Sequence, residues 1–253
     1  MSNLLQPDIY ILSDNIILYV FDIKDFSSPL HEFMDSLFVD ICEGNSGNSL
    51  QDAKLAIKKL YEGKNDDWTI GATAEFFLHL FLRSQGFKQE CLFCNLEEDS
   101  IKKGFDGYYS NESDTWIMES KAGLETSVGG THHEKLRTAY YDLSKKLSGK
   151  DKSKNNPWKN AFNHARIVES SLTIKEALNA LSNQFNQGIY QKIQDFNIIP
   201  CATIFKNDFA EFKDHLEIKN SVDSIKNTFN ATKIKLICVT QESVSLFLQY
   251  IGI

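Results

Sequence analysis

Two carboxylates and one lysine that could do chemistry together lie in the segment GFDGYYSNESDTWIMESKAG, residues 104–123. Asp106 falls in one strand-like run, and Glu119 and Lys121 fall two positions apart in the next. Side chains alternate between the two faces of a strand, so Glu119 and Lys121 are expected to point to the same side. A turn over residues 111–114 would place the two strands side by side and bring Asp106 near Glu119.

This set of residue types suits a divalent-metal site. Mg²⁺ favours one or two carboxylates together with water and phosphate oxygens, so Asp106 and Glu119 are the expected ligands of Mg²⁺ or Mn²⁺. A metal held there lowers the pKa of a bound water and polarises a phosphoryl group. Lys121 would hold that water or stabilise charge that develops on the phosphate. The alternative is a surface Glu–Lys pair on an edge strand, because short motifs also match by chance.

A third carboxylate, Glu75, stands inside the otherwise apolar run ATAEFFLHLFL. Helical spacing places it beside apolar neighbours and beside His79. A carboxylate on such a face needs a metal or a charged partner, because ionised side chains are rarely buried alone. The sequence leaves both open: a metal ligand, or a glutamate that forms an ion pair with a core His or Lys.

A helical Glu75, then GFDG, then ESK on the next strand, resembles the PD-(D/E)xK phosphodiesterase superfamily in order and element type. Within it, GATAEFFLHLFL with GFDG and WIMESKAG, and a later strand NIIPCATIF, are similar to the nuclease subunit of Hachiman-type bacterial anti-phage systems. The likeness covers about residues 68–240, and Phe105 stands where the superfamily motif has proline. It implies a DNA nuclease restrained by a large helicase partner. By position, Asp106 and Glu119 would bind metal, Lys121 would be the catalytic lysine, and Glu75 would be an accessory metal ligand.

Hydrophobic patterning predicts the elements that must position these residues. Strands are expected at Ile9–Leu12, Ile16–Phe21, Gln89–Leu96, Phe105–Ser110, Thr115–Lys121, Ile199–Phe205 and Lys233–Thr240. Helices are expected after Pro29, after an N-cap at Ser49, over 66–87, over Glu134–Leu147, from Thr173 to about Phe196, between the last two strands, and at the C-terminus. Thr173 and Glu176 have capping-box spacing.

From residue 66 onward the predicted order is helix, three strands, helices, strand, helix, strand. This order favours an α/β fold in which helices flank a mixed sheet. We therefore expect a restriction-endonuclease-like core over residues 66–253. Residues 1–65, with a hairpin and helices, are expected to form an N-terminal α+β addition.

Charge is distributed unevenly along the chain. The net charge of −7 argues against a general basic coat for nucleic acid. Between Lys135 and Arg166, however, nine Lys or Arg residues accompany only two acidic ones. This segment could contact phosphate, and its candidate DNA-binding residues are Lys145, Lys146, Lys150, Lys152 and Lys154. The alternative is a solvated loop around GKDKSKNNP.

Other chemistry is less well supported. The five cysteines are an odd and sparse set, which indicates reduced thiols. Cys91 and Cys94 form a lone CxxC, for which we expect a strand pattern and not a zinc site. His132–His133 follows two glycines and is expected to lie in a flexible loop. No GxxxxGK[ST] phosphate loop is present, so the chain itself supplies no NTPase.

The residue patterns favour a Mg²⁺-dependent nuclease, and the resemblance implies that it cuts DNA in a defence complex with a helicase or ATPase partner. No run approaches the roughly 20 apolar residues of a membrane helix, and MSNLLQPDIY lacks a secretory pattern. We therefore expect a cytoplasmic protein without membrane association. Two alternatives remain, a dimeric type II restriction endonuclease and a non-catalytic DNA-binding or regulatory subunit. The set Asp106, Glu119 and Lys121 favours catalysis, and the excess negative charge favours an enzyme assisted by a partner.

Overall fold

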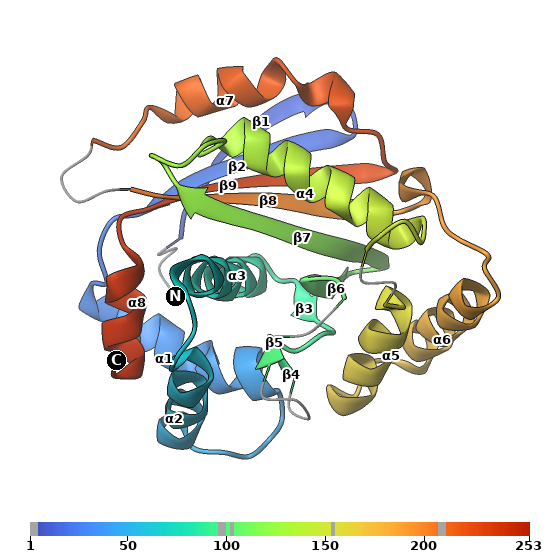
Figure 1. Ribbon diagram of the computed structural model, residues 1–253, viewed down its shortest axis with the longest axis horizontal. Helices are drawn as coiled ribbons and strands as arrows, with labels where there is room; N and C mark the ends of the chain where they lie inside the picture. The colour runs from blue at the N-terminus through green and yellow to red at the C-terminus, as the bar shows by residue number, and fades with distance from the viewer. Residues whose placement is uncertain (1–4, 96–99, 102–103, 153–154, 207–210) are drawn as a thin grey trace.

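A mixed seven-stranded sheet forms the middle of the molecule, and helices cover both of its faces (Figure 1). The computed structural model describes residues 5–95, 100–101, 104–152, 155–206 and 211–253. The strand order is β1-β2-β9-β8-β7-β6-β3. This arrangement confirms the predicted α/β class with a mixed sheet flanked by helices.

Four neighbouring strands of the sheet, β2, β9, β8 and β7, run parallel, and the strands at both edges are antiparallel. The sheet consists of β1 (Asp8–Ser13), β2 (Ile16–Ile23), β3 (Lys88–Gln89), β6 (Gly107–Asn111), β7 (Asp114–Leu124), β8 (Asn197–Phe205) and β9 (Lys233–Gln241). A separate two-stranded ribbon pairs β4 (Cys94–Asn95) with β5 (Ser100–Ile101). The single strand predicted over Gln89–Leu96 is therefore wrong: β3 and β4 are two short strands in different sheets.

The helices form two layers. One face of the sheet packs against α1 (Ser28–Glu43), α2 (Leu50–Tyr61), α3 (Asp66–Ser84) and α8 (Val244–Ile251). The opposite face packs against α4 (His132–Leu147) and α7 (His215–Asp223). Two further helices, α5 (Pro157–Ile167) and α6 (Leu172–Asn186), pack against each other beyond the β6 end of the sheet and join the same buried cluster (Figure 1). Short 3₁₀ turns lie at Ile193–Asp195 and Lys226–Thr228. Buried apolar side chains from alternate positions of each central strand join one layer or the other, which explains why these strands are apolar almost throughout.

The N-terminal residues are built into this same sheet. β2 pairs in parallel with β9 from Ile16, opposite Ile234, to Ile23, opposite Gln241. α1 and α2 share one buried cluster with α3 and α8. The segment expected as an addition thus extends the sheet and its core at the β9 side.

Two helical predictions need correction. α5 lies in a segment for which no helix was expected, and it begins with Pro157 after the N-cap Asn156, whose side chain accepts hydrogen bonds from two backbone N–H groups. α6 begins after Ser171, which caps the N–H of Ile174, and it ends at Asn186, whereas the helix was expected to run from Thr173 to about Phe196.

The described residues also bear on the expectations about membrane helices and about the cysteines. No helix among them is both long enough and apolar enough to cross a membrane. All five cysteines are buried, and none forms a disulfide.

Candidate active site

The end of β6 determines where Asp106 lies. β6 pairs with β7 only as far as Gly107, opposite Met118, so the β7 edge beyond that point has no strand partner from β6. Asp106, immediately before β6, takes this place: its Oδ2 accepts a hydrogen bond from the Ser120 N–H at 2.7 Å. The structure thus brings Asp106 beside Glu119, as the hairpin predicted.

Gly107, the residue after Asp106, allows close packing at the start of β6. A Cβ built on Gly107 would lie 2.4 Å from a ring carbon of Tyr109 and 3.1 Å from the Met118 Cβ. Only glycine therefore lets the Tyr109 ring lie over this backbone without displacement. In the GFDG sequence, Asp106 is therefore followed directly by the glycine that begins β6 and packs against Tyr109.

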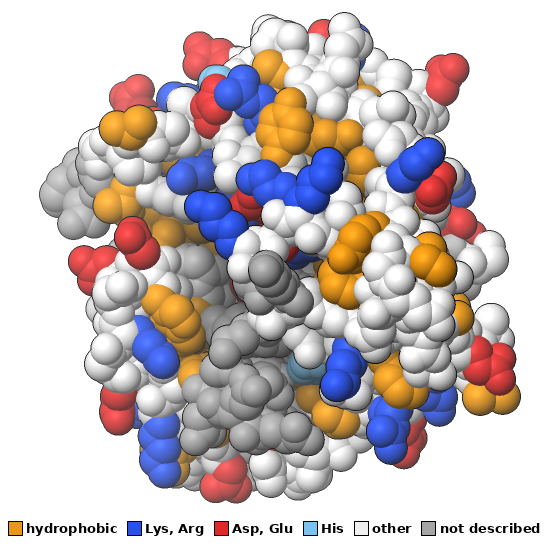
Figure 2. Space-filling view, turned by 45° about the vertical axis from the view of Figure 1, so that its right-hand side comes forward, with side chains coloured by type: hydrophobic (Ala, Val, Ile, Leu, Met, Phe, Trp, Pro, Cys, Tyr) orange, Lys and Arg blue, Asp and Glu red, His pale blue; other side chains and the backbone are white. Residues whose placement is uncertain are grey.

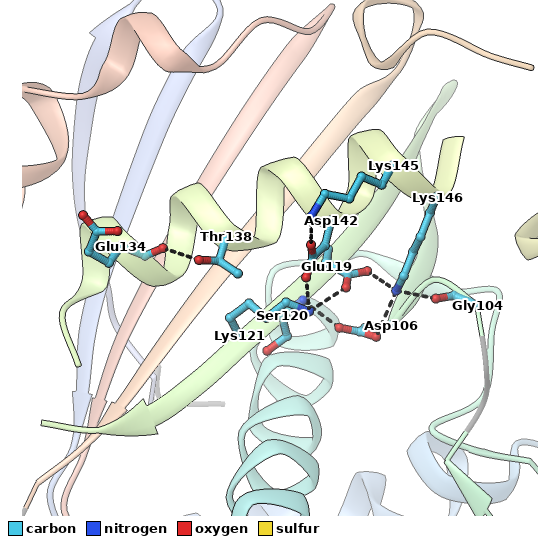
Figure 3. A network of polar contacts seen from close by, with 10 residues as sticks. All are labelled: Gly104, Asp106, Glu119, Ser120, Lys121, Glu134, Thr138, Asp142, Lys145 and Lys146. Carbon is cyan, nitrogen blue, oxygen red and sulfur yellow. Dashed lines mark hydrogen bonds and ion pairs between the residues drawn. The ribbon is translucent and has the colours of Figure 1, made fainter. Parts of the chain in front are cut away.

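Alternation along β7 directs Glu119 and Lys121 toward α4. Ile117 belongs to the cluster on the α4 side, and Met118 belongs to the cluster on the α3 side. Glu119 and Lys121 share the parity of Ile117, and Figure 3 shows both between β7 and α4. The Lys121 Nζ lies 2.9 Å from Glu119 Oε1 and 3.3 Å from Oδ2 of Asp142 on α4.

Burial and charge set the electrostatics of this pair. The Glu119 side chain is 1 % exposed. Burial raises its pKa above the ordinary value, and the Asp106 carboxylate adds to the rise against the opposing effect of the two lysines. Burial alone would lower the pKa of Lys121, but Glu119 and Asp106 outweigh it and raise that pKa. The lysine is therefore held as an ammonium beside its carboxylates.

A second lysine enters the site from the last turn of α4. The Lys146 Nζ lies 2.6 Å from Glu119 Oε2, 2.6 Å from the Gly104 carbonyl oxygen and 3.9 Å from Asp106 Oδ1. Glu119 and Asp106 raise the pKa of Lys146, although burial opposes them. The sequence singled out Lys146 only as a phosphate-binding candidate; the structure places it against the carboxylates (Figure 3).

Glu75 lies in a different environment. Its Oε1 is 3.3 Å from the ring nitrogen Nε2 of His79, one turn further along α3, and the other ring nitrogen of His79 contacts the Tyr109 hydroxyl. Tyr109 belongs to the cluster on the α3 side of the sheet. This contact matches the alternative of a glutamate paired with a core histidine, and the metal-ligand role of Glu75 stays a prediction.

The donor set supports a small metal site. Asp106 Oδ1 and Glu119 Oε2 both lie near the Lys146 Nζ, and the Asp106 side chain is 21 % exposed, so this side of the site is partly open to solvent. Within the described part of the chain, no three His, Cys, Asp or Glu residues cluster as a metal site. Two carboxylates completed by water and phosphate oxygens fit Mg²⁺, which rarely occupies a site made of protein ligands alone.

The remaining basic candidates lie on the last turn of α4 or after it in the chain. Lys145, on the same turn of α4, is paired with Asp142 at 3.0 Å, and Lys150 and Lys152 beyond the helix are exposed. Lys154 falls outside the described residues. Figure 2, which brings the end of α4 toward the viewer, shows Lys and Arg side chains grouped across the middle of this side of the molecule.

His132 is placed differently from the expectation of a flexible loop. It is the first residue of α4, is 8 % exposed, and its Nε2 lies 3.1 Å from the Val239 carbonyl oxygen. Burial lowers its pKa to about 4, so the ring is neutral near neutral pH. His133, beside it, contacts the Ser221 hydroxyl at 2.8 Å. Both histidines are thus tied to the fold.

Comparison with known protein families identifies a family that spans nearly the whole chain. The model of a family described as HamA matches residues 9–251 of the 253. It covers both faces of the sheet, the N-terminal strands and the lysine–carboxylate site. No curated protein matches the chain.

Proposed function

The chain belongs to the HamA family of Hachiman defence-associated proteins, and from this premise we propose that it is a metal-dependent deoxyribonuclease. It would hydrolyse phosphodiester bonds in DNA as the effector of the anti-phage complex. The observation that carries the proposal is the meeting of Asp106, Glu119 and Lys121 in one partly open site. Two buried or half-buried carboxylates with adjacent ammonium groups are poorly explained by stability alone, because desolvation of ion pairs is costly.

Each residue has a role that its position supports. Asp106 and Glu119 would hold Mg²⁺ or Mn²⁺, which lowers the pKa of a bound water and polarises the phosphoryl group. The Ser120 N–H donates a hydrogen bond to Asp106 Oδ2 and holds this carboxylate beside β7. Lys121, a lysine 28 % exposed at its side chain, can donate to a phosphate oxygen as negative charge develops there.

The surface around the site supports DNA as the substrate. Lys145 lies on the last turn of α4 beside Lys146, and Lys150 and Lys152 follow the end of that helix. Ammonium groups at this position would neutralise phosphates on either side of the scissile bond. Lys154 continues the same segment and belongs to the same proposal.

The family also supports a helicase partner, because the Hachiman system includes one. A nuclease with no control would cut the host chromosome. This chain has no phosphate-loop motif, so it cannot couple NTP hydrolysis to movement along DNA. Its net charge of −7 also weakens unaided association with a polyanion. We therefore place cleavage under the control of that partner.

Metal binding tests the proposal most directly. Calorimetric titration of the full chain with Mn²⁺ should give a site that Asp106→Ala removes. Asp114→Ala is the matched control, because among the described residues its carboxylate forms an ion pair only with Lys233, at the surface. Plasmid nicking in Mg²⁺, abolished by EDTA, should follow the same order of variants. If Asp106→Ala binds Mn²⁺ as the unmodified chain does, the metal role fails and the non-catalytic subunit becomes the better account.

A further inference from the structure

The four carboxylate oxygens of Asp106 and Glu119 are divided between different donors. Asp106 Oδ2 accepts from the Ser120 N–H, and Glu119 Oε1 accepts from Lys121. The two remaining oxygens, Asp106 Oδ1 and Glu119 Oε2, both face the Lys146 ammonium, at 3.9 and 2.6 Å. Asp106 and Glu119 would hold a divalent cation through their carboxylates, and Lys146 lies against both groups.

Lys146 also has a third oxygen neighbour. Its Nζ donates to the Gly104 carbonyl oxygen at 2.6 Å, two residues before Asp106. The ammonium therefore donates two hydrogen bonds, to Gly104 and Glu119, and lies at ion-pair distance from Asp106. The side chain is 19 % exposed and reaches the carboxylates from the C-terminal turn of α4.

We propose that Lys146 is a tethered cation that competes with the divalent metal for Asp106 and Glu119. Metal loading then requires the last turn of α4 to release this side chain from the carboxylates. The proposal rests on the metal-dependent function proposed above and adds a positioning residue that controls how readily the site is loaded. A partner or a DNA phosphate that draws the Lys146 ammonium away would favour the loaded site.

Lys121, in contrast to Lys146, does not lie between Asp106 and Glu119. It contacts the opposite oxygen of Glu119, and its second partner is Asp142 on α4, not Asp106. Removal of Lys121 would therefore leave Asp106 Oδ1 and Glu119 Oε2 beside the Lys146 ammonium. The competition is specific to one of the two lysines.

The test compares Mn²⁺ affinity by calorimetry for the full chain and three variants. Lys146→Met removes the ammonium and keeps the length of the side chain, and it should bind Mn²⁺ about tenfold or more tightly, the scale of one charge-assisted hydrogen bond. Lys146→Arg keeps the charge and should stay near the unmodified affinity. Lys233→Met removes a surface ammonium paired with Asp114 and should change nothing.

The outcomes separate this inference from the proposed function. Unchanged or weaker Mn²⁺ binding by Lys146→Met, while the unmodified chain binds Mn²⁺, overturns the competition and leaves the nuclease proposal intact. Absence of Mn²⁺ binding in every variant overturns both. The gain must also disappear in Asp106→Ala/Lys146→Met; if it persists, the tighter site lies elsewhere and the inference fails. Thermal unfolding of each variant identifies loss of fold, and Lys146→Gln then replaces the methionine variant.

Discussion

Lys121 and Lys146 carry the same charge and touch the same carboxylate, but they reach it from different elements. Lys121 lies on β7 two positions from Glu119, so strand alternation alone predicts their meeting. Lys146 lies 27 residues from Glu119, on a helix that crosses the sheet. No local pattern in the sequence encodes the packing of that helix turn on β7. The first contact was therefore predictable, whereas the second required the fold.

Lys121→Ala should separate catalysis from metal binding. The lysine is no metal ligand, so Mn²⁺ binding and unfolding temperature should be retained. Cleavage should fall by roughly 10²–10³-fold, the scale for loss of one donor that stabilises the transition state. Plasmid nicking measured beside Lys233→Ala, which removes an ammonium far from the site, gives the comparison. Nicking close to the unmodified rate would remove Lys121 from the mechanism.

His132 should make folding sensitive to acid. Its folded-state pKa of about 4 lies below the ordinary value of 6.5, so the unfolded chain binds this proton first as the pH falls. The stability that the neutral ring provides is fully present above pH 6.5 and declines as the pH falls toward 4, by about 3 kcal/mol. Urea unfolding at pH 7 and pH 4 measures the loss. His132→Gln should show a smaller drop between the two pH values; an equal drop would assign the acid sensitivity to other groups.

At the level of elements, the helix–strand order near the site was predictable, and the short helix α5 that follows α4 was not. α3 has an apolar run too long for a strand, and β6 and β7 flank a short polar turn that marks a hairpin. α5 has only 11 residues and directly follows a lysine-rich loop. Its few apolar residues are too sparse to separate it from that loop by periodicity. Asn156 and Pro157 were the available signal, because an Asn N-cap followed by proline at the first helical position marks a helix start.

The end of α4 and the segment that follows it should determine the salt dependence of DNA binding. Neutralising Lys145, Lys150 and Lys152 together leaves Lys146 and the carboxylates untouched. For each phosphate that these lysines no longer neutralise, the slope of log affinity against log salt should fall by about one unit. Fluorescence anisotropy across a salt series measures the slope. Neutralising the exposed residues Lys24, Lys59 and Lys64 is the control, and equal slopes in the two triple variants would make the segment an ordinary solvated loop.

For the molecule as a whole, one pairing could not be read from the sequence. Ile16 and Ile234 stand side by side in β2 and β9, more than 200 residues apart. Hydrophobic patterning predicts both strands, but pairing between such distant segments depends on the whole topology. The boundary expected at residue 65 consequently does not separate two sheets or two cores, because strands and helices from both sides share them.

The complete chain should form a stable complex with the helicase of its system. In that complex, cleavage should be suppressed until the partner engages foreign or damaged DNA. Co-expression followed by size-exclusion chromatography tests assembly, and plasmid cleavage with and without the partner tests restraint. If the chain elutes alone, or cuts equally well in both states, the dimeric restriction endonuclease becomes the leading account.

The buried cysteines have a practical consequence for spectroscopy. All five are enclosed by the core, and burial raises the pKa of Cys42, Cys201 and Cys238 well above the usual thiol value. Such thiols hold little thiolate near neutral pH and react slowly with maleimides. A single cysteine introduced at exposed Lys150 would therefore take a fluorophore selectively. Energy transfer from that dye to a labelled duplex would report the distance between the end of α4 and bound DNA.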